Sequence, residues 1–216
     1  MTTNQTVAVV GLGNIGQAVG TNLSKSDRIF IAADRNVEKA ATLAEQWGVN
    51  AKASDIASAV KNAGIIILSI PFEAVAGFIK DHENDLEGKI IIDPSNPIAP
   101  DENGGFKKII DANNSAGQIN AASLPNGAKL VKALGTLGAA SLIKAAYQAP
   151  EKAVLFYAND DTSVDSEVED LIRDNGFQAV RVGGIDQSIR IEVFGDLHEF
   201  GALGKTVNLA EAKTKI

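Results

Sequence analysis

The residues with the clearest chemical potential form a glycine-rich run that follows a short apolar segment near the start of the chain. Residues 7–10 are apolar, and Gly11-Leu12-Gly13-Asn14-Ile15-Gly16 follows them directly as a Gly-x-Gly-x-x-Gly motif. Apolar residues then recur at helical spacing. In such a strand, turn and helix, the first glycine permits the tight turn, the second lets a pyrophosphate approach the backbone, and the third lets the helix pack closely. The run therefore predicts a pyrophosphate-binding turn, the alternative being a glycine turn of some other α/β protein.

A carboxylate stands where the second strand of such a unit should end. The apolar run 29–33 leads into Asp34, 23 positions after the first glycine of the motif. An acid at this place accepts hydrogen bonds from the hydroxyls of an adenosine ribose, and it would repel a 2′-phosphate. Arg35 and Lys39 have the opposite effect on a 2′-phosphate, because a guanidinium can bind it or stack on adenine. Arg35 is alternatively explained as a solvated surface charge. The expected cofactor is NADP(H) or NAD(H).

The rest of the chain alternates apolar runs with segments of helical periodicity. Predicted strands cover 7–10, 29–33, 49–53, 65–70, 90–92, 130–134, 154–157 and 179–182. Predicted helices cover 37–47, 54–61, a segment after Pro71 through 79, a segment before Pro125, 137–147, 164–173 and 187–200. Such alternation predicts an α/β fold with a doubly wound, mostly parallel sheet and helices on both faces.

Ligands of a doubly wound sheet lie at the carboxyl ends of its strands, so three strand ends provide further candidates. They are Ser69-Ile70-Pro71-Phe72, Pro94-Ser95-Asn96-Pro97 and Ala133-Leu134-Gly135-Thr136. Their hydroxyl, amide and backbone groups can surround a nicotinamide ring. The alternative to a ligand role is a structural one, in which the prolines end strands and Asn96 forms hydrogen bonds within a turn. The polar stretch 95–117 is either a functional flap or a surface excursion.

The sequence offers no clear acid or base. Both histidines, His82 and His198, are expected within helices, where a histidine is more often structural than catalytic. His198 is the better candidate, because its glycine-bounded segment 195–204 could close over the cofactor. Neither tyrosine has a lysine four residues later, and neither a His-x-x-x-His nor a Gly-x-Ser-x-Gly motif occurs. Hydride transfer needs mainly proximity and orientation, so catalysis by positioning, with no catalytic side chain, is expected.

Composition limits the class of protein. The chain has 216 residues, of which 45% are hydrophobic, and 27 acidic against 20 basic side chains give a net charge of −7. That charge argues against a nucleic-acid partner. Without cysteine, the chain has no disulfide and no thiolate metal site, and we expect no metal. No leader segment or membrane-length apolar run is seen, so a cytoplasmic protein without a membrane partner is expected.

Five segments together resemble the family of NADPH-dependent deazaflavin (coenzyme F-420) reductases. In chain order they read Val-Val-Gly-Leu-Gly-Asn-Ile-Gly, Ile-Leu-Ser-Ile-Pro-Phe-Glu-Ala-Val, Ile-Ile-Asp-Pro-Ser-Asn-Pro, Leu-Val-Lys-Ala-Leu-Gly-Thr-Leu-Gly-Ala and Gly-Ala-Leu-Gly-Lys. The resemblance implies a Rossmann NAD(P)-binding domain, placed at 1–128, and a smaller C-terminal α/β part at 129–216 that closes an acceptor cleft. It also implies hydride transfer between a nicotinamide and a flavin-like ring, and commonly a homodimer.

The resemblance also distributes roles among the residues. It implies pyrophosphate binding by residues 11–16, ribose binding around Asp34, Arg35, Asn36 and Lys39, a nicotinamide side at Ser69, Ile70, Pro71, Pro94, Asn96 and Pro97, and acceptor binding at Ala133, Leu134, Gly135, Thr136 and Leu203. The chain departs from the family twice. Asp34 stands where relatives that prefer NADP usually have a hydroxyl residue, and Leu134-Gly135 stands where many relatives have Phe-Asn. The acceptor therefore need not be a deazaflavin.

These observations favour an NAD(P)H-dependent oxidoreductase that moves a hydride between C4 of the nicotinamide and a flavin-like or other small acceptor. Two alternatives stay open. A non-catalytic dinucleotide-binding or redox-sensing protein would also lack an acid and a base. An S-adenosylmethionine methyltransferase also has glycines after its first strand and an acid after its second, but the three-glycine spacing and the proline-ended fourth strand disfavour it.

Overall fold

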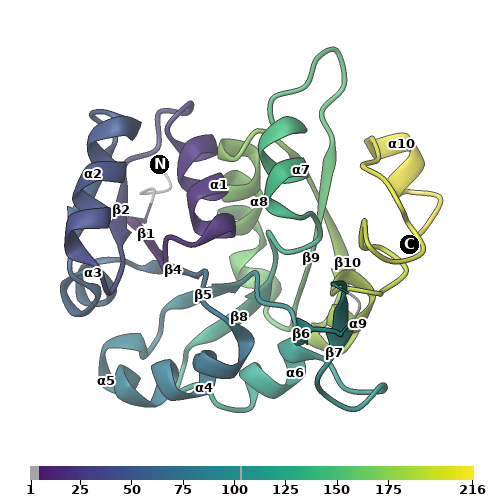
Figure 1. Ribbon diagram of the computed structural model, residues 1–216, viewed down its shortest axis with the longest axis horizontal. Helices are drawn as coiled ribbons and strands as arrows, with labels where there is room; N and C mark the ends of the chain where they lie inside the picture. The colour runs from purple at the N-terminus through teal and green to yellow at the C-terminus, as the bar shows by residue number, and fades with distance from the viewer. Residues whose placement is uncertain (1–4, 103) are drawn as a thin grey trace.

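The computed structural model describes residues 5–102 and 104–216, and these residues form one eight-stranded sheet with helices on both faces (Figure 1). The strand order is β10-β9-β8-β5-β4-β1-β2-β3. The strands are β1 Val7–Val10, β2 Phe30–Ala33, β3 Ala51–Ser54, β4 Ile65–Leu68, β5 Ile90–Asp93, β8 Lys129–Lys132, β9 Val154–Asn159 and β10 Gln178–Gly183. Six of these strands, β8, β5, β4, β1, β2 and β3, run parallel to one another. Strand β9 is antiparallel to β8 and parallel to β10.

The six parallel strands follow the order of a Rossmann sheet, which confirms the predicted fold class. Strand order reverses between β1 and β4, and the crevice at their carboxyl ends is the usual ligand site of such sheets. The sheet continues without interruption across residue 128, because β8 pairs directly with β5.

Two layers of helices bury the two faces of the sheet. The helices are α1 Asn14–Leu23, α2 Val37–Trp47, α3 Ile56–Asn62, α4 Phe72–Asp81, α5 Glu83–Leu86, α6 Ala116–Ala121, α7 Ala139–Lys144, α8 Asp165–Asp174, α9 Ser188–Ile191 and α10 Leu209–Ala212. Successive side chains of a strand point to opposite faces. Val7 and Val9 accordingly join the apolar cluster under α1, α2, α7 and α8, and Ala8 and Val10 join the cluster under α3, α4 and α5.

Local sequence signals explain where several helices begin and end. Asn36 caps α2 by accepting a 3.0 Å hydrogen bond from the backbone N–H of Lys39, and Gly48 ends the same helix with φ +85°. Asp55 caps α3 in the same way, through the N–H of Ser58. The helix predicted at 37–47 therefore has the predicted bounds, and most other elements lie within two or three residues of the prediction.

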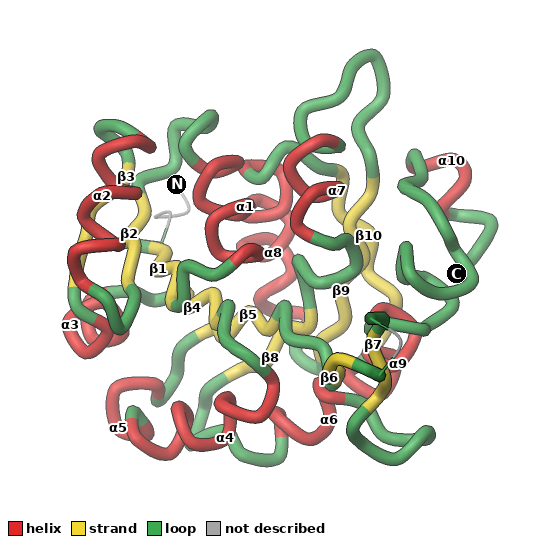
Figure 2. Tube along the Cα trace, in the orientation of Figure 1, coloured by secondary structure: helices red, strands yellow, loops and turns green. Residues whose placement is uncertain are grey.

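The polar stretch 95–117 contains a short antiparallel hairpin. Its strands are β6 Ile98–Pro100 and β7 Phe106–Lys108, which lie beside the carboxyl edge of the main sheet (Figure 2). The stretch ends at α6. The described part of the stretch therefore has strand pairing of its own.

The helix predicted at 187–200 exists only at its start, as α9, and the prediction is wrong from Glu192 onward. After α9 the chain turns out of the helix at Glu192, which has extended backbone angles, φ −89° and ψ 164°. The Glu192 carboxylate accepts hydrogen bonds of 2.9 Å from the backbone N–H groups of Ala116 and Gly117. Further on, a Cβ at Gly195 would lie 2.3 Å from the carbonyl oxygen of Arg190. Long-range hydrogen bonds and close packing thus replace the helix that the local pattern indicates.

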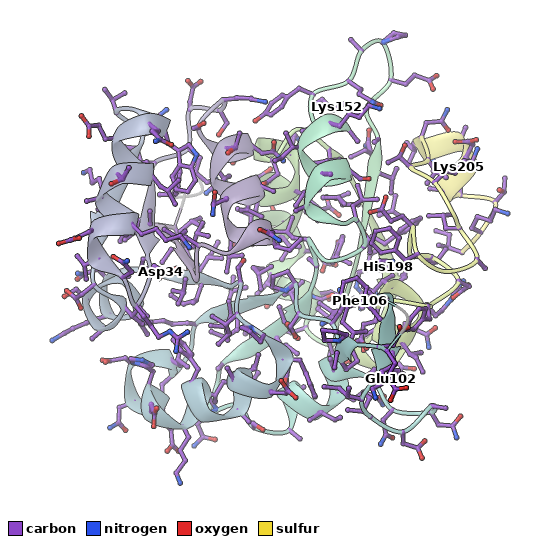
Figure 3. All side chains as sticks on the ribbon, viewed as in Figure 1. Asp34, Glu102, Phe106, Lys152, His198 and Lys205 are labelled. Carbon is purple, nitrogen blue, oxygen red and sulfur yellow. The ribbon has the colours of Figure 1, made fainter. Side chains whose placement is uncertain are left out.

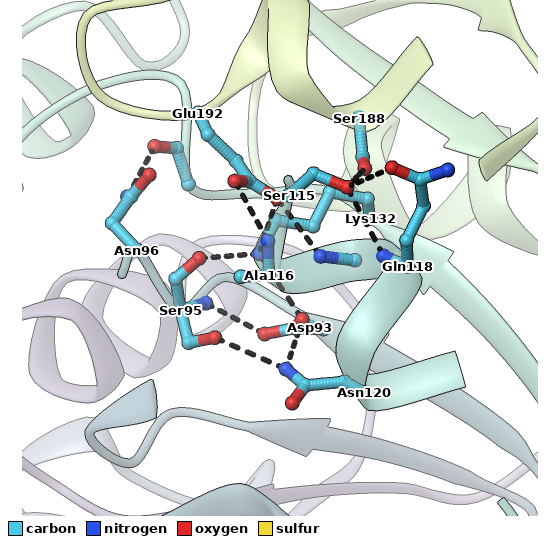
Figure 4. Close-up of polar contacts among 12 residues, drawn as sticks. Asp93, Ser95, Asn96, Ser115, Ala116, Gln118, Asn120, Lys132, Ser188 and Glu192 are labelled. Carbon is cyan, nitrogen blue, oxygen red and sulfur yellow. Dashed lines mark hydrogen bonds and ion pairs between the residues drawn. The ribbon is translucent and has the colours of Figure 1, made fainter. Parts of the chain in front are cut away.

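Glu192 belongs to a buried polar network beneath the carboxyl edge of the sheet (Figure 4). Lys132 Nζ donates a 3.1 Å hydrogen bond to Asp93 Oδ2, lies 3.6 Å from Glu192 Oε1, and also donates to the carbonyl of Ser95. Asn120 Nδ2 adds a 2.9 Å bond to Asp93 Oδ2. The side chains of the lysine and its two carboxylates are at most 3% exposed. The network ties β5, β8, α6 and the segment after α9 together.

Replacing Lys132 by methionine should lower the free energy of unfolding by about 3–5 kcal/mol, because it leaves two buried carboxylates without their cation. Urea denaturation measures this change. Lys129→Met is the matched control on the same strand: Lys129 pairs with Asp161 at 2.9 Å, but its side chain is 34% exposed. That control should barely move the urea midpoint, since exposed pairs contribute little. Equal midpoints for the two variants would contradict the assigned role of the network.

Candidate functional site

The glycine turn joins β1 to α1 and leaves no room for side chains at two of its three glycines. Gly11 has φ +87°, and a Cβ there would lie 2.4 Å from the carbonyl oxygen of Ser69. A Cβ at Gly16 would lie 2.0 Å from the carbonyl oxygen of Gly11. At Gly13, in contrast, a Cβ would meet no protein atom within 4 Å. Protein atoms thus pack closely against the turn at Gly11 and Gly16, whereas the turn is open at Gly13.

The open side of the turn is the N-terminal end of α1, a helix of ten residues whose first turn has no acidic residue and whose cap, Gly13, has no side chain. First-turn N–H groups of a helix lack intrahelical partners and carry a partial positive charge. An anion at this place would be stabilised by these backbone donors.

Asp34 lies beside the turn and is held by two backbone donors. Leu12 N–H donates to Oδ2 at 2.8 Å, and Asn36 N–H donates to Oδ1 at 3.0 Å. Lys39 Nζ lies 3.8 Å from Oδ2. Partial burial by itself would raise the pKa of Asp34, but these two hydrogen bonds and the charges of Lys39 and Arg35 outweigh it and lower the pKa below its ordinary value. The carboxylate is therefore ionised at neutral pH.

Two cavities meet at this turn. One, which we call the Asp34 cavity, has a volume of about 550 Å³, and the other, the Phe106 cavity, has a volume of about 430 Å³. Both are lined by Gly13, Ser69, Ile70 and Pro71. Figure 3 labels side chains at both ends of the site. Asp34 lies at the end near α2, and Phe106, which belongs to the hairpin, lies with His198 at the other end. Together the cavities form an elongated site across the carboxyl ends of β1 and β4.

The two cavities differ in chemistry. The Asp34 cavity contains two carboxylates and two cations and is further lined by Val10, Gly11, Leu12, Asp34, Arg35, Lys39, Ile56, Ala74, Gly77, Phe78 and Asp81. The Phe106 cavity is mainly apolar and is further lined by Asn14, Ile15, Phe72, Glu73, Pro94, Ser95, Asn96, Ile98, Phe106, Ile109, Gly135, Leu137, Gly138, Ala139, Val193, His198 and Phe200. The first suits a nucleoside with hydroxyls, and the second suits flat apolar rings.

The wall of the Phe106 cavity is organised around one carbonyl. Gly135 O accepts a 3.1 Å hydrogen bond from Asn96 Nδ2 and a 2.9 Å bond from His198 Nε2. Asn96 Oδ1 accepts the N–H of Val193 at 2.7 Å, and His198 Nδ1 accepts the N–H of Phe200 at 2.9 Å. Asn96 and His198 therefore both form hydrogen bonds with backbone atoms. Because a carbonyl can only accept, the proton of His198 lies on Nε2.

His198 differs from its predicted setting. It lies in a turn region outside any helix and is 1% exposed. Burial is the largest influence and lowers the pKa of His198, even though the Gly135 carbonyl and Glu199 act to raise it. The imidazole is thus neutral at physiological pH with both nitrogens occupied. It fixes the wall of the cavity, and its one ring N–H donates to the carbonyl of Gly135.

Most residues predicted to bind the cofactor line one of the two cavities. Three do not: Gly16 lies behind the turn, Asn36 caps α2, and Pro97 is buried outside both cavities. Of the residues predicted to contact the acceptor, Gly135 lines the Phe106 cavity. The other four lie elsewhere: Ala133, Leu134 and Thr136 are at most 3% exposed within the core, and Leu203 packs under β9 and β10.

Sequence reasoning missed much of the apolar lining of the Phe106 cavity. The missed residues are Ile98, Phe106, Ile109, Leu137, Val193 and Phe200. They come from the hairpin, from helix starts and from the turns after α9, where no periodicity marks a buried face. One signal was available, because Phe106 is the single aromatic residue in the polar stretch 95–117.

One hydroxyl at the junction of the cavities is unsatisfied. Ser69 Oγ is buried and has no hydrogen-bond partner among the described residues. A buried hydroxyl without a partner is costly unless a bound molecule supplies one. Together with the open backbone at Gly13, this hydroxyl fits a ligand with oxygen acceptors lying across the turn.

Two other kinds of feature are absent from the described residues. No helix there is long and apolar enough to span a membrane. These described residues also contain no group of three or more His, Cys, Asp or Glu side chains that could hold a metal ion.

Part of the chain is similar to a known family of proteins. Residues 6–97 match the family model described as NADP oxidoreductase coenzyme F420-dependent. The F420-dependent NADP reductase of Methanocaldococcus jannaschii is 29% identical over 97 residues, which cover 41% of this chain and 44% of that protein. The match thus spans less than half of that relative. The resemblance noted in the sequence is confirmed over this segment.

Solved structures extend the likeness of fold to nearly the whole chain. A hypothetical protein from Sinorhizobium meliloti has a TM-score of 0.80 and 25% identity, and the alignment covers 94% of each chain. A putative F420-dependent NADP reductase from Arthrobacter sp. FB24 has a TM-score of 0.68 and 21% identity, covering 85% of this chain and 87% of that one. The sheet and its flanking helices are therefore a shared architecture.

The buried neutral imidazole predicts a pH dependence of stability. Because the folded pKa of His198 lies below the ordinary 6.5, its contribution to stability is complete above that pH and is lost as the pH falls through 6.5 toward the folded value. Urea midpoints should therefore fall between about pH 7.5 and about pH 5.5. His198→Gln, which keeps a donor and an acceptor, should lose this part of the dependence, whereas the control His82→Gln should keep it. Identical pH profiles for all three proteins would refute the assignment.

Proposed function

We propose that this chain, whose residues 6–97 carry the coenzyme F420-dependent NADP oxidoreductase domain, is an NAD(P)H-dependent oxidoreductase that transfers a hydride between the nicotinamide and a small ring acceptor. The observation that carries the proposal is the meeting of a polar and an apolar cavity at the glycine turn. A dinucleotide has the same sequence of parts: a nucleoside, a diphosphate and a redox ring.

The residues present fit the cofactor from end to end. The Asp34 cavity would hold the adenosine, with Asp34 and Arg35 at the ribose. The N–H groups at the start of α1 would hold the diphosphate, and the orphan hydroxyl of Ser69 offers an additional donor. The nicotinamide would enter the Phe106 cavity between the strand ends at Pro71 and Asn96.

When bound, the reduced nicotinamide supplies a hydride from C4, carrying two electrons, to the acceptor ring, and solvent supplies the proton that completes the reduction. The chain contributes positioning. The apolar walls exclude water from the space between the rings, and Asn96 and His198 keep the wall at Gly135 rigid. No side chain that we assign to the site has to give or take a proton.

The remaining parts of the proposal come from the resemblance. We propose a cytoplasmic homodimer, and a C-terminal part from residue 129 that closes the acceptor side of the cleft. Supporting the last point, Gly135, Leu137, Val193 and Phe200 come from this part and line the Phe106 cavity. Neither a nucleic acid nor a membrane is proposed as a partner.

The direct test mixes the purified protein with NADPH or NADH and a deazaflavin, FMN or a quinone, and follows the absorbance of the reduced nicotinamide. Gly13→Ala is the informative variant, because its Cβ meets no protein atom yet occupies the space through which a diphosphate must approach. We expect turnover by the wild type, and for the variant an unchanged urea midpoint with dinucleotide binding weakened at least about tenfold, or about 1.4 kcal/mol.

An unchanged dissociation constant in Gly13→Ala would refute binding at the turn. Tight dinucleotide binding without turnover of any acceptor would instead favour the non-catalytic, redox-sensing alternative.

Cofactor preference should depend on Asp34. Replacing it by serine removes a negative charge from the 2′ position, so the ratio of NADPH to NADH affinity should rise by about tenfold, or about 1.4 kcal/mol. Titration calorimetry measures both affinities. Because Asp34 also holds the N–H of Leu12, both affinities can fall while their ratio reports the charge. The same substitution at Asp161, outside both cavities, is the control. A constant ratio in Asp34→Ser would show that another residue selects the cofactor.

A further inference from the structure

We infer that the acceptor in the Phe106 cavity is a flat, uncharged ring system, and that the cavity discriminates against rings bearing a phosphate or carboxylate group. The inference rests on the proposed function, since it concerns the acceptor of the same site. It follows from which charges line the cavity and which groups are exposed in it.

The described lining of the cavity carries negative charge and no positive charge. Glu73, at the first turn of α4, is the one charged residue among the described residues that line the cavity, and neither a lysine nor an arginine lines it. His198 is neutral because burial lowers its pKa. A second carboxylate, Glu199, accepts a hydrogen bond from the N–H of Gly138 in the lining. An anionic acceptor would meet the carboxylate of Glu73, with that of Glu199 bound to the lining residue Gly138, and no cation in the described lining.

Two lysines close to the cavity lining are already bound. Lys132, behind the wall, contacts Asp93 and Glu192 and is buried. Lys108 follows Phe106 in the hairpin by two residues, and its Nζ donates to the carbonyl oxygens of Ala112 at 3.0 Å and Asn114 at 2.7 Å. Neither lysine is available to an acceptor without breaking contacts that the fold uses.

Exposed aromatic surface points to the shape of the acceptor. Phe106 is 55% exposed and Phe200 is 56% exposed, although both line the cavity. The Phe200 ring also lies 5.5 Å from the imidazole of His198, measured between ring centroids. Apolar rings left exposed at a cavity are covered favourably by a flat ligand that stacks or packs on them. A flat neutral ring therefore satisfies both the charge and the shape of this cavity.

Riboflavin and FMN test this inference, because they share one ring system and differ by a phosphate. Each is titrated into the protein saturated with NADP⁺, with flavin fluorescence as the binding signal, and each is then tried as an acceptor with NADPH. We expect riboflavin to bind at least about tenfold more tightly than FMN, with the difference shrinking at high salt as the charges are screened.

Three variants sharpen the test. Glu73→Lys should bring FMN affinity close to that of riboflavin, whereas Glu83→Lys, the same change outside the lining, should not. Phe106→Ala should weaken riboflavin binding by about tenfold without moving the urea midpoint, because the ring is half-exposed. Phe194→Ala, which removes a ring that is 51% exposed but does not line the cavity, should leave riboflavin binding unchanged.

The outcomes separate the two proposals. Equal or tighter binding of FMN, or no binding of riboflavin at all, would overturn the inference whatever the turnover. Riboflavin that binds more tightly than FMN but is not reduced would support the inference and count against the proposed hydride transfer.

Discussion

The close packing of the glycine turn against the ends of β1 and β4 is the constraint on which the rest of the site depends. Gly11 and Gly16 leave no space for a Cβ, so α1 begins directly at the carboxyl edge of the sheet. Asp34 then ties the end of β2 to the same turn through the N–H of Leu12. The start of α1 is thereby aimed at the junction of two cavities of different chemistry, as a bridging diphosphate requires.

The far side of the site is held by polar side chains whose hydrogen bonds and ion pairs are made within the protein. Lys132 joins the carboxylates of Asp93 and Glu192 below the sheet edge, and Asn96 and His198 converge on Gly135 O above it. Each of these side chains stabilises backbone segments from distant parts of the chain. The cavity itself is left with apolar walls, which suits a reaction that needs orientation more than proton transfer.

The sequence predicted those features whose causes are local. Periodicity located β1, α2 and the buried strand β4, and spacing located Asp34 beside the glycine turn. The Phe106 cavity was beyond such reasoning, because its walls are built by contacts between residues far apart, such as His198 with Gly135 and Glu192 with Ala116. The same contacts explain the false helix at 187–200: local pattern favoured a helix there, and long-range hydrogen bonds overrode it.

The central claim is that backbone N–H groups at the start of α1 bind the diphosphate of a pyridine dinucleotide. Amide chemical shifts and hydrogen exchange, followed by NMR during titration with NADP⁺, test it residue by residue. The largest shifts and new protection from exchange are expected at residues 12–15, with smaller changes at 69–71 and around Asp34. Shifts confined to another surface, or no shifts at millimolar nucleotide, would contradict it.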